Sequence, residues 1–389
     1  MLSLRDFATV LESIFKSGTN FFVASLFVSI FGLLRFGEYA ELMLYALLIN
    51  ALMTSVLFEP IARLRDLQLE VGSCLIPITK IFVLHFLAIF AVVQILIVFW
   101  LGYAHINTIL LTIISVSIVL SEFIRRLYLH SRIPSYLLVS ATFKLLFIIF
   151  LFVFERLSLT VLNPHNFIIL IYTTFIISDF FLYLFFSHLS KKYAGVDSLD
   201  YIFKLLWTGI GWLPVIALLQ WSAGNQLLIE LANNDSHRSL GEIRIFQMIF
   251  NFTILAYPLI EYSKIKLNPQ LRQWSLLAIF GICCIIGLFF HFYGESLGVS
   301  LGAINVMLLF ASAVASIINV YYVKQLRMHG ATLIILISYI LLALNVELFG
   351  HFIILQGGVT GVCLYLFCQA IFLSLMFHLK VKAVRRSIS

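Results

Sequence analysis

Charge is scarce in this chain of 389 residues, since Asp, Glu, Lys and Arg together make up 11% of it. Soluble globular proteins carry about twice that proportion of charged residues. Apolar residues make up 62% of the sequence, and long stretches of them recur along the whole chain. A helix of about twenty such residues crosses the hydrocarbon core of a bilayer. The composition therefore excludes a soluble globular protein and predicts an all-α polytopic membrane protein.

The sequence also lacks the motifs of several enzyme classes. It contains neither the G-x-x-x-x-G-K-[ST] loop that binds ATP phosphates nor the H-E-x-x-H motif of zinc proteases. Its five cysteines do not have the spacing of zinc ligands. No connection between the apolar stretches is long enough to fold as a catalytic domain. We therefore expect the protein not to be an enzyme and to hold no cofactor and no metal.

The apolar stretches predict about twelve transmembrane helices. They lie near residues 17–35, 42–60, 78–101, 106–124, 135–154, 166–187, 205–230, 245–262, 274–293, 297–319, 332–350 and 354–378. The seventh stretch is interrupted by glycine and proline, so we expect a kinked or broken helix. Such a helix is tolerated where its freed backbone groups face protein or water.

A short repeat suggests that the chain has two halves. Gly37-Glu38 follows the first predicted helix, and Gly241-Glu242 follows the seventh. Two six-helix halves would share one orientation in the membrane, because six is an even number of crossings. We therefore predict two lobes, residues 1–195 and 196–389, although so short a match also arises by chance.

The basic residues predict the orientation of the chain. If both termini are cytoplasmic, 20 of the 25 lysines and arginines lie on the inner side, and Lys144 lies within a predicted helix. The four on the outer side are Arg35, Arg156, Arg238 and Arg244. Cytoplasmic loops of membrane proteins carry such an excess of positive charge, so both termini are predicted to be cytoplasmic. The net charge of +7 then reflects an anionic inner leaflet and requires no nucleic acid partner.

Two opposite charges are predicted to lie within neighbouring helices at the same depth. Lys144 comes nine residues after Ser135, and Asp179 comes eight residues before Ser187. At about 1.5 Å per residue, both lie roughly 12 to 13 Å from the inner ends of their helices. One interpretation is a packing bridge in which the two charges neutralise each other. In the other, Lys144 attracts an anionic group of a substrate, while Asp179 tunes it or exchanges a proton.

Further candidate site residues lie toward the outer side. Arg35 and Arg244 adjoin the two Gly-Glu sequences and could guide an anion, although interfacial anchoring is an alternative. Trp212 and Gln220 contribute to an unusually polar and aromatic seventh helix. Such residues suit the wall of a cavity that contacts sugars, but tryptophan is equally common at membrane interfaces.

Two passages resemble a known family. "SGTNFFVASLFVSIFGLLRFGEYAEL" resembles the first helix and following F-G-x-Y turn of the Wzx-like lipid-linked oligosaccharide flippases, with Phe36, Gly37 and Tyr39 matching the turn. These O-antigen transporters form a branch of the multidrug/oligosaccharidyl-lipid/polysaccharide exporter superfamily. "WSAGNQLLIELANNDSHRSLGEIRIFQ" is similar to their passage from the seventh to the eighth helix. There, Asn225 replaces a frequent aspartate, and Ile243 replaces the tyrosine of the turn.

The resemblance implies two six-helix lobes around a central cavity and transport by alternating access, driven by an ion gradient. The substrate would be a polyprenyl-pyrophosphate-linked oligosaccharide, flipped across the bacterial inner (plasma) membrane for O-antigen, lipopolysaccharide or capsule polysaccharide biosynthesis. The lipid bilayer is a partner, and a polysaccharide polymerase and a chain-length regulator are candidate partners. On this hypothesis Asp179 forms the charge pair or couples the ion, and the substrate-binding residues are Lys144, Arg35, Arg244, Trp212 and Gln220.

Two alternatives remain open. A multidrug or cation exporter of the same superfamily would have the same fold, although its cavity would favour anionic residues. A membrane-embedded polysaccharide polymerase usually needs a sizeable outer loop that carries catalytic residues, and the connections here are short.

Overall fold

A computed structural model of the chain describes residues 4–59, 75–100, 107–130, 135–156, 163–190, 211–250, 300–328 and 331–388, with Gly281, Ile285 and Leu288. Every regular element in these ranges is a helix. Seven of the described helices are long and apolar enough to cross a membrane. The protein is therefore an all-α, multi-pass membrane protein, as the composition predicts. The number of twelve spans and the cytoplasmic position of both termini stay predictions.

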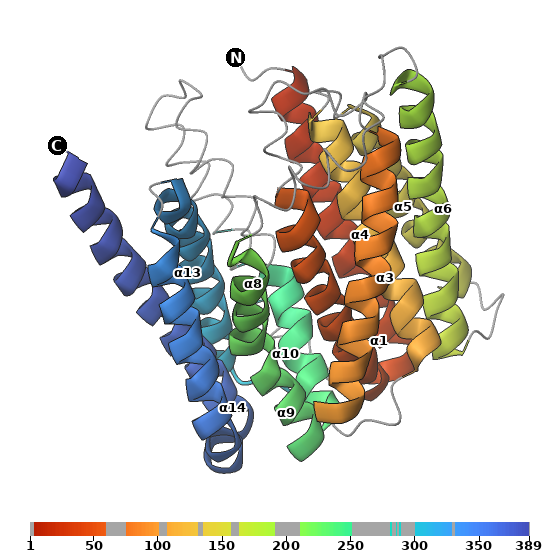
Figure 1. Cartoon of the computed structure of the whole chain (residues 1–389). Coiled ribbons are helices and arrows are strands. Elements are labelled where there is room, and N and C mark those ends of the chain that lie inside the picture. Colours follow the sequence, from red (N-terminus) through yellow and green to blue (C-terminus); the bar gives the residue numbers. More distant parts are fainter. Residues whose placement is uncertain are drawn as a thin grey trace. The chain divides into compact units, whose positions relative to one another are not determined.

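Figure 1 shows the described helices in chain order. They are α1 (Leu4–Met53), the π-helical turn η1 (Thr54–Phe58), α3 (Leu75–Trp100), α4 (Thr108–His130), α5 (Ser135–Arg156), α6 (Pro164–Ser190), α8 (Leu213–Trp221), the π-helical turn η3 (Ser222–Gln226), α9 (Leu227–Asn234), α10 (His237–Phe250), α13 (Ala303–Met328) and α14 (Thr332–Ile388). The predicted span 274–293 lies outside the continuously described ranges.

The two longest helices are each broken at a glycine. In α1 the break is at Gly32, with φ 79° and ψ 170°, and in α14 it is at Gly358, with φ 51° and ψ −139°. Positive φ is costly for a residue with a Cβ atom, so glycine determines where the chain changes direction. Helix α1, continued by η1, and helix α14 thus each extend over two of the predicted spans, but the breaks lie within the predicted spans 17–35 and 354–378 and not between spans. The turn expected at Phe36–Tyr39 is helical instead, and the break lies before it.

Side-chain caps explain where two helices begin. The Asn107 Oδ1 atom accepts a hydrogen bond from the backbone N–H of Leu110 at 3.1 Å, at the start of α4. Asn163 does the same for Asn166 at 2.7 Å, and Pro164 follows it as the first residue of α6. Asparagine is a favoured N-cap, and proline is favoured at the first helical position, because the first N–H groups of a helix have no partner within it.

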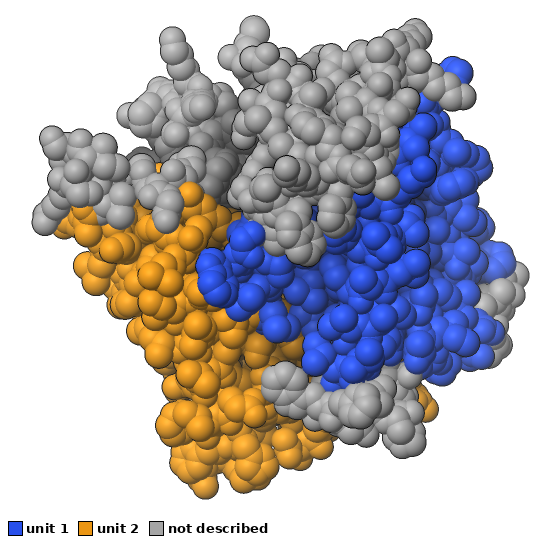
Figure 2. All heavy atoms as spheres, in the orientation of Figure 1, with its two compact units in different colours: residues 1–15, 42–218 blue, residues 16–41, 219–389 orange. Residues whose placement is uncertain are grey.

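The chain forms two compact units, which Figure 2 distinguishes by colour. Unit 1 comprises residues 1–15 and 42–218, and unit 2 comprises residues 16–41 and 219–389. Unit 2 therefore includes part of α1 in addition to the C-terminal helices. The predicted division at 195/196 into two six-helix lobes around a cavity stays a prediction.

Aromatic stacking and one buried hydroxyl fix the neighbours of α4 in unit 1. The rings of Phe82 on α3 and Phe123 on α4 are stacked with centroids 4.2 Å apart, and Phe58 stacks on Phe123 at 6.3 Å. The buried Tyr128 hydroxyl of α4 donates a hydrogen bond of 2.8 Å to the carbonyl of Leu182 on α6. A buried hydroxyl without a partner is costly, so this bond fixes α4 against α6.

Interhelical hydrogen bonds join α13 to α14 in unit 2. The Asn319 side chain donates to the carbonyl of Ala370 at 3.0 Å and accepts from Ser374 at 2.8 Å. Ser312 donates to the carbonyl of Leu366 at 3.2 Å. Small residues along α13 let the two helices approach closely enough for these polar contacts, which is a common way to pack helices in a membrane.

Candidate functional site

Lys144 of α5 and Asp179 of α6 form a buried ion pair in unit 1. The Lys144 Nζ atom lies 2.7 Å from both carboxylate oxygens of Asp179. The two side chains are 12% and 3% exposed. The sequence predicts that these two residues lie at equal depth on neighbouring helices. The structure brings their charged groups into contact.

Hydroxyl groups and one aromatic ring complete the surroundings of this ion pair. Ser121 of α4 lies 3.4 Å from Lys144 Nζ, and Ser140 lies 3.5 Å from an Asp179 oxygen. The ammonium group lies 5.4 Å from the centre of the Phe175 ring, within the range of a cation–π interaction. Buried charges need such additional contacts to offset the loss of hydration.

The ion pair limits what Lys144 can do. Its charge is matched by one carboxylate at short distance, so an anion can reach the ammonium group only if the pair opens. The geometry accordingly fits the neutralising interpretation, and a direct contact of Lys144 with substrate stays a prediction. The neighbouring tyrosines also have packing partners, since Tyr172 bonds to Met43 and Tyr183 to Thr79.

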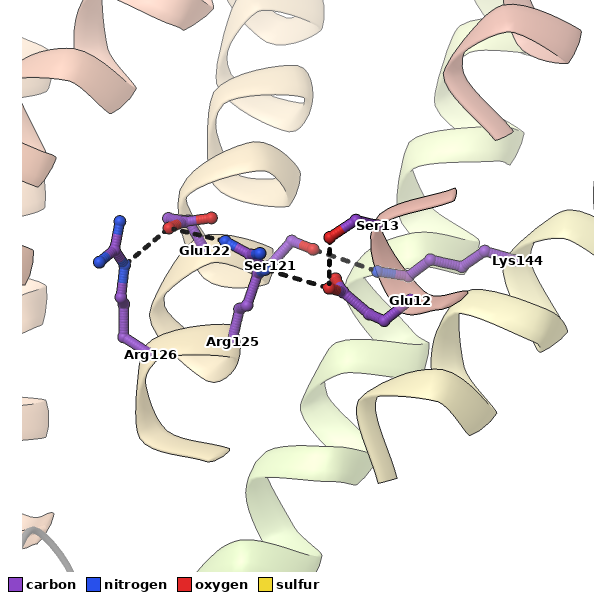
Figure 3. Close-up of polar contacts among 7 residues, drawn as sticks. All are labelled: Glu12, Ser13, Ser121, Glu122, Arg125, Arg126 and Lys144. Atoms are coloured by element: carbon purple, nitrogen blue, oxygen red, sulfur yellow. Dashed lines mark hydrogen bonds and ion pairs between the residues drawn. The ribbon is translucent and has the colours of Figure 1, made fainter. Parts of the chain in front are cut away.

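A second charge cluster adjoins this site and includes a contact that the sequence did not predict (Figure 3). Arg125 Nε of α4 lies 3.2 Å from Glu12 of α1, and Arg126 Nε lies 2.8 Å from Glu122. Ser121 precedes Glu122 and links the cluster to Lys144. Glu122 precedes Arg125 by three residues and Arg126 by four, and side chains at these spacings meet on one face of a helix. The pairing within α4 can therefore be predicted from the sequence. Nothing in the sequence links Glu12 to α4.

Arg244 of α10 is buried without a carboxylate partner in the described part of unit 2. Its residue is 8% exposed, and its Nη1 atom donates to the Gln247 side chain at 2.8 Å. Among the residues that the structure describes, its buried Nε atom has no hydrogen-bond partner. A buried guanidinium with an open donor and no counter-charge is costly for the protein alone. Arg244 is therefore a candidate for binding an anion.

The other predicted site residues are exposed. Arg35 is 57% exposed at its side chain and pairs with Glu38 at 2.9 Å. Trp212 is 64% exposed, and Gln220 is also exposed. Trp212 belongs to unit 1 with Lys144 and Asp179, whereas Arg35, Gln220 and Arg244 belong to unit 2. Lys144 and Asp179 are thus the predicted site residues that the described structure brings into contact.

In the seventh predicted helix, Gly211 has a positive φ of 49° before α8 begins, and Gly224 lies in the π-helical turn η3. The η3 turn, in unit 2, organises a polar cluster. Gln226, in this turn, donates to Glu347 of α14 at 2.8 Å and to Glu230 of α9 at 3.2 Å. Gln369 of α14 donates to the carbonyl of Ala223 at 3.0 Å. One amide therefore links the acidic residues of two helices. Helical spacing predicts the pairing of Gln226 with Glu230, but not the contact with α14.

The two Gly-Glu sequences meet in unit 2. A Cβ atom on Gly37 would lie 1.6 Å from the carbonyl oxygen of His237, and one on Gly241 would lie 2.7 Å from the carbonyl oxygen of Leu33. Beside this crossing of α1 and α10, the Glu41 and His237 side chains are 3.0 Å apart. The hydrogen bond with Glu41 raises the pKa of His237 above its ordinary value. The repeat is therefore a packing device.

Comparisons with known proteins identify the fold of this chain. No protein-family model matches the sequence, and no curated protein matches it. A solved structure of a multidrug resistance MATE family transporter of the MOP superfamily, in an inward-facing conformation, aligns with all of this chain and 97% of its own. The TM-score is 0.54 and the sequence identity is 11%. The two proteins therefore share a fold.

Proposed function

We propose that this chain is a flippase that moves polyprenyl-pyrophosphate-linked oligosaccharides across the bacterial inner membrane. It would act by alternating access driven by an ion gradient, in the biosynthesis of O-antigen or capsule polysaccharide. The likeness to a MATE family transporter over the full chain supports a transporter, since that protein has the same fold. The resemblance of two sequence passages to Wzx-like flippases supports the choice of cargo.

Arg244 is the observation that carries this proposal. It is a buried cation for which the described chain provides an amide but no carboxylate. A pyrophosphate supplies the missing negative charge and several acceptor oxygens, and arginine binds phosphates through two or more of its donors. A cationic cargo would be repelled by the same guanidinium. The substrate therefore carries an anionic group that Arg244 binds.

The remaining candidate residues take supporting roles in this proposal. The Arg35 side chain is exposed on α1, where it can meet the pyrophosphate if its pair with Glu38 opens. Trp212 and Gln220 are exposed and suited to contact sugars. Lys144 and Asp179 would bind the head group or couple the ion when their pair opens. A polymerase and a chain-length regulator would use the flipped product.

Export of drugs or other organic cations is a second candidate function. The neighbour with the shared fold is a multidrug resistance transporter. Glu230 and Glu347, linked through Gln226, offer two carboxylates in unit 2 that could attract a cation. Transport assays with cargoes of opposite charge distinguish the two functions.

The Arg244→Gln variant is expected to lose flipping activity without losing stability. Removing a charge-assisted hydrogen bond costs about 1.5 to 3 kcal/mol, which corresponds to roughly a ten- to hundredfold weaker interaction. Because the deleted charge has no carboxylate partner in the described structure, the fold should not be destabilised. The measurement is flipping of a polyprenyl-pyrophosphate-linked oligosaccharide in proteoliposomes, together with the thermal midpoint of each purified variant.

Arg244→Lys and Arg35→Gln complete this experiment. Lysine keeps the charge but not the planar fork of donors, so Arg244→Lys should retain part of the activity. Arg35→Gln removes an exposed arginine of the same unit and should change activity less than Arg244→Gln. The proposal fails if the wild type moves ethidium but not the lipid-linked oligosaccharide, because the cargo would then be a cation.

A further inference from the structure

The crossing of α1 and α10 is unusually tight for a contact between two helices. The carbonyl oxygen of His237 occupies the place where a side chain at Gly37 would begin. Gly241 approaches α1 in the same way, because a Cβ atom added to it would lie 2.7 Å from the Leu33 carbonyl oxygen and 3.3 Å from the Gly37 nitrogen. Backbone atoms therefore form the contact on both helices, and any change in the angle between them alters it directly.

An acid–imidazole pair lies beside this crossing. The Glu41 Oε2 atom is 3.0 Å from the His237 Nε2 atom. Glu41 is 8% exposed, whereas the His237 side chain is 33% exposed and can exchange protons with water. Neutral histidine offers one N–H donor, but protonated histidine adds a full positive charge opposite the carboxylate. The strength of the pair therefore depends on protonation of His237.

The charged groups around His237 favour its protonated form. On α1, Glu41 and Glu38 both act electrostatically to keep the proton on the ring. Arg35 pairs with Glu38 and is exposed. On the α10 side, Arg238 lies 3.5 Å from Glu242, and Asp235 accepts a hydrogen bond from Ser239. The nearest carboxylate thus belongs to the opposite helix, so protonation strengthens the contact between α1 and α10.

We propose that Glu41 and His237 form a pH-sensitive clasp that holds the crossing of α1 and α10 closed when His237 is protonated. This inference goes beyond the proposed function, because it concerns a helix contact and does not depend on the cargo. The predicted topology places the clasp on the outer side of the membrane. Acidification on that side would then restrain the two helices.

The direction of the pH effect follows from the pKa of His237. This pKa is higher in the folded protein than its ordinary value of 6.5. The stabilisation from the protonated pair is therefore complete below about pH 6.5 and is lost as the pH rises through the folded-state pKa. The crossing should be tight at pH 6 and looser at pH 8.5.

Hydrogen–deuterium exchange of the full chain in lipid nanodiscs tests this inference. After correction for intrinsic exchange rates, residues 33–44 and 237–246 of the wild type should exchange several-fold more slowly at pH 6 than at pH 8.5. His237→Gln keeps a hydrogen-bonding side chain but does not titrate, so its exchange should be equal at the two pH values. His165→Gln replaces an exposed histidine of unit 1 and should keep the wild-type difference.

Glu41→Gln provides an independent variant if His237→Gln does not fold. It removes the carboxylate but keeps an acceptor, so the pH difference in both segments should shrink. The clasp is disproved if the wild type shows no difference between the two pH values. It is equally disproved if His237→Gln or Glu41→Gln keeps the full wild-type difference, because another group would then control the crossing.

Discussion

Replacing Gly37 with alanine is expected to prevent normal folding of unit 2. The new Cβ atom would lie 1.6 Å from the His237 carbonyl oxygen and 2.4 Å from its carbonyl carbon. These are backbone atoms, so no change of side-chain rotamer can relieve the overlap. Inserting one extra carbon into a packed interior costs about 1 to 3 kcal/mol when side chains can adjust, and here the cost should be higher. The measurement is the yield of monodisperse protein and its thermal midpoint in detergent.

Gly18→Ala is the matched control for this result. Gly18 lies on the same helix, and a Cβ atom there would meet nothing within 4 Å. Alanine is more favourable than glycine inside a helix by roughly 0.5 to 1 kcal/mol, so this variant should be as stable as the wild type or slightly more stable. Gly241→Ala, with its nearest backbone atom at 2.7 Å, should fall between the two. Equal thermal midpoints for Gly18→Ala and Gly37→Ala would show that the helices do not cross here.

Lys144→Ala is expected to destabilise unit 1 strongly and to abolish transport. It would leave the carboxylate of Asp179, 3% exposed, with the Ser140 hydroxyl 3.5 Å away but without its bonded cation. Removing one partner of a buried ion pair costs about 3 to 5 kcal/mol, because the other charge stays buried and unpaired. Lys144→Arg keeps the positive charge and should lose less stability and less activity than Lys144→Ala. The loss of stability is measured by the thermal midpoints of the purified variants. The loss of transport is measured by complementation in cells that lack their own flippase.

The double variant Lys144→Ala/Asp179→Ala separates the two interpretations of this pair. It removes both charges, so its stability should recover much of what Lys144→Ala loses. If export also recovers, the two residues only neutralise each other. If stability recovers but export does not, the substrate or the coupling ion needs one of these charges. A double variant as unstable as Lys144→Ala would contradict the paired geometry itself.

The amino-acid pattern alone predicts the class of the protein and one part of the candidate site. Low charge and recurrent apolar stretches required membrane helices, because only such stretches are stable in hydrocarbon. Lys144 and Asp179 could be paired in advance, because the rise per residue fixes depth along a helix and neighbouring helices run in opposite directions. The repeated Gly-Glu sequences can also be seen in the sequence. Their glycines lie at the close crossing of α1 and α10, which the sequence does not reveal.

The contacts between helix faces, and the charges that have no partner among the described residues, could be seen only in three dimensions. Glu12 reaches Arg125 across 113 residues of sequence, and Gly37 contacts His237 across 200. Hydropathy fixes where a helix lies along the membrane normal but not its rotation or its neighbours. The same limit hid the burial of Arg244, since arginine is mostly exposed in proteins and the sequence placed this one just before a predicted span. Contacts between distant segments depend on packing in three dimensions, which a linear pattern of apolar residues does not specify.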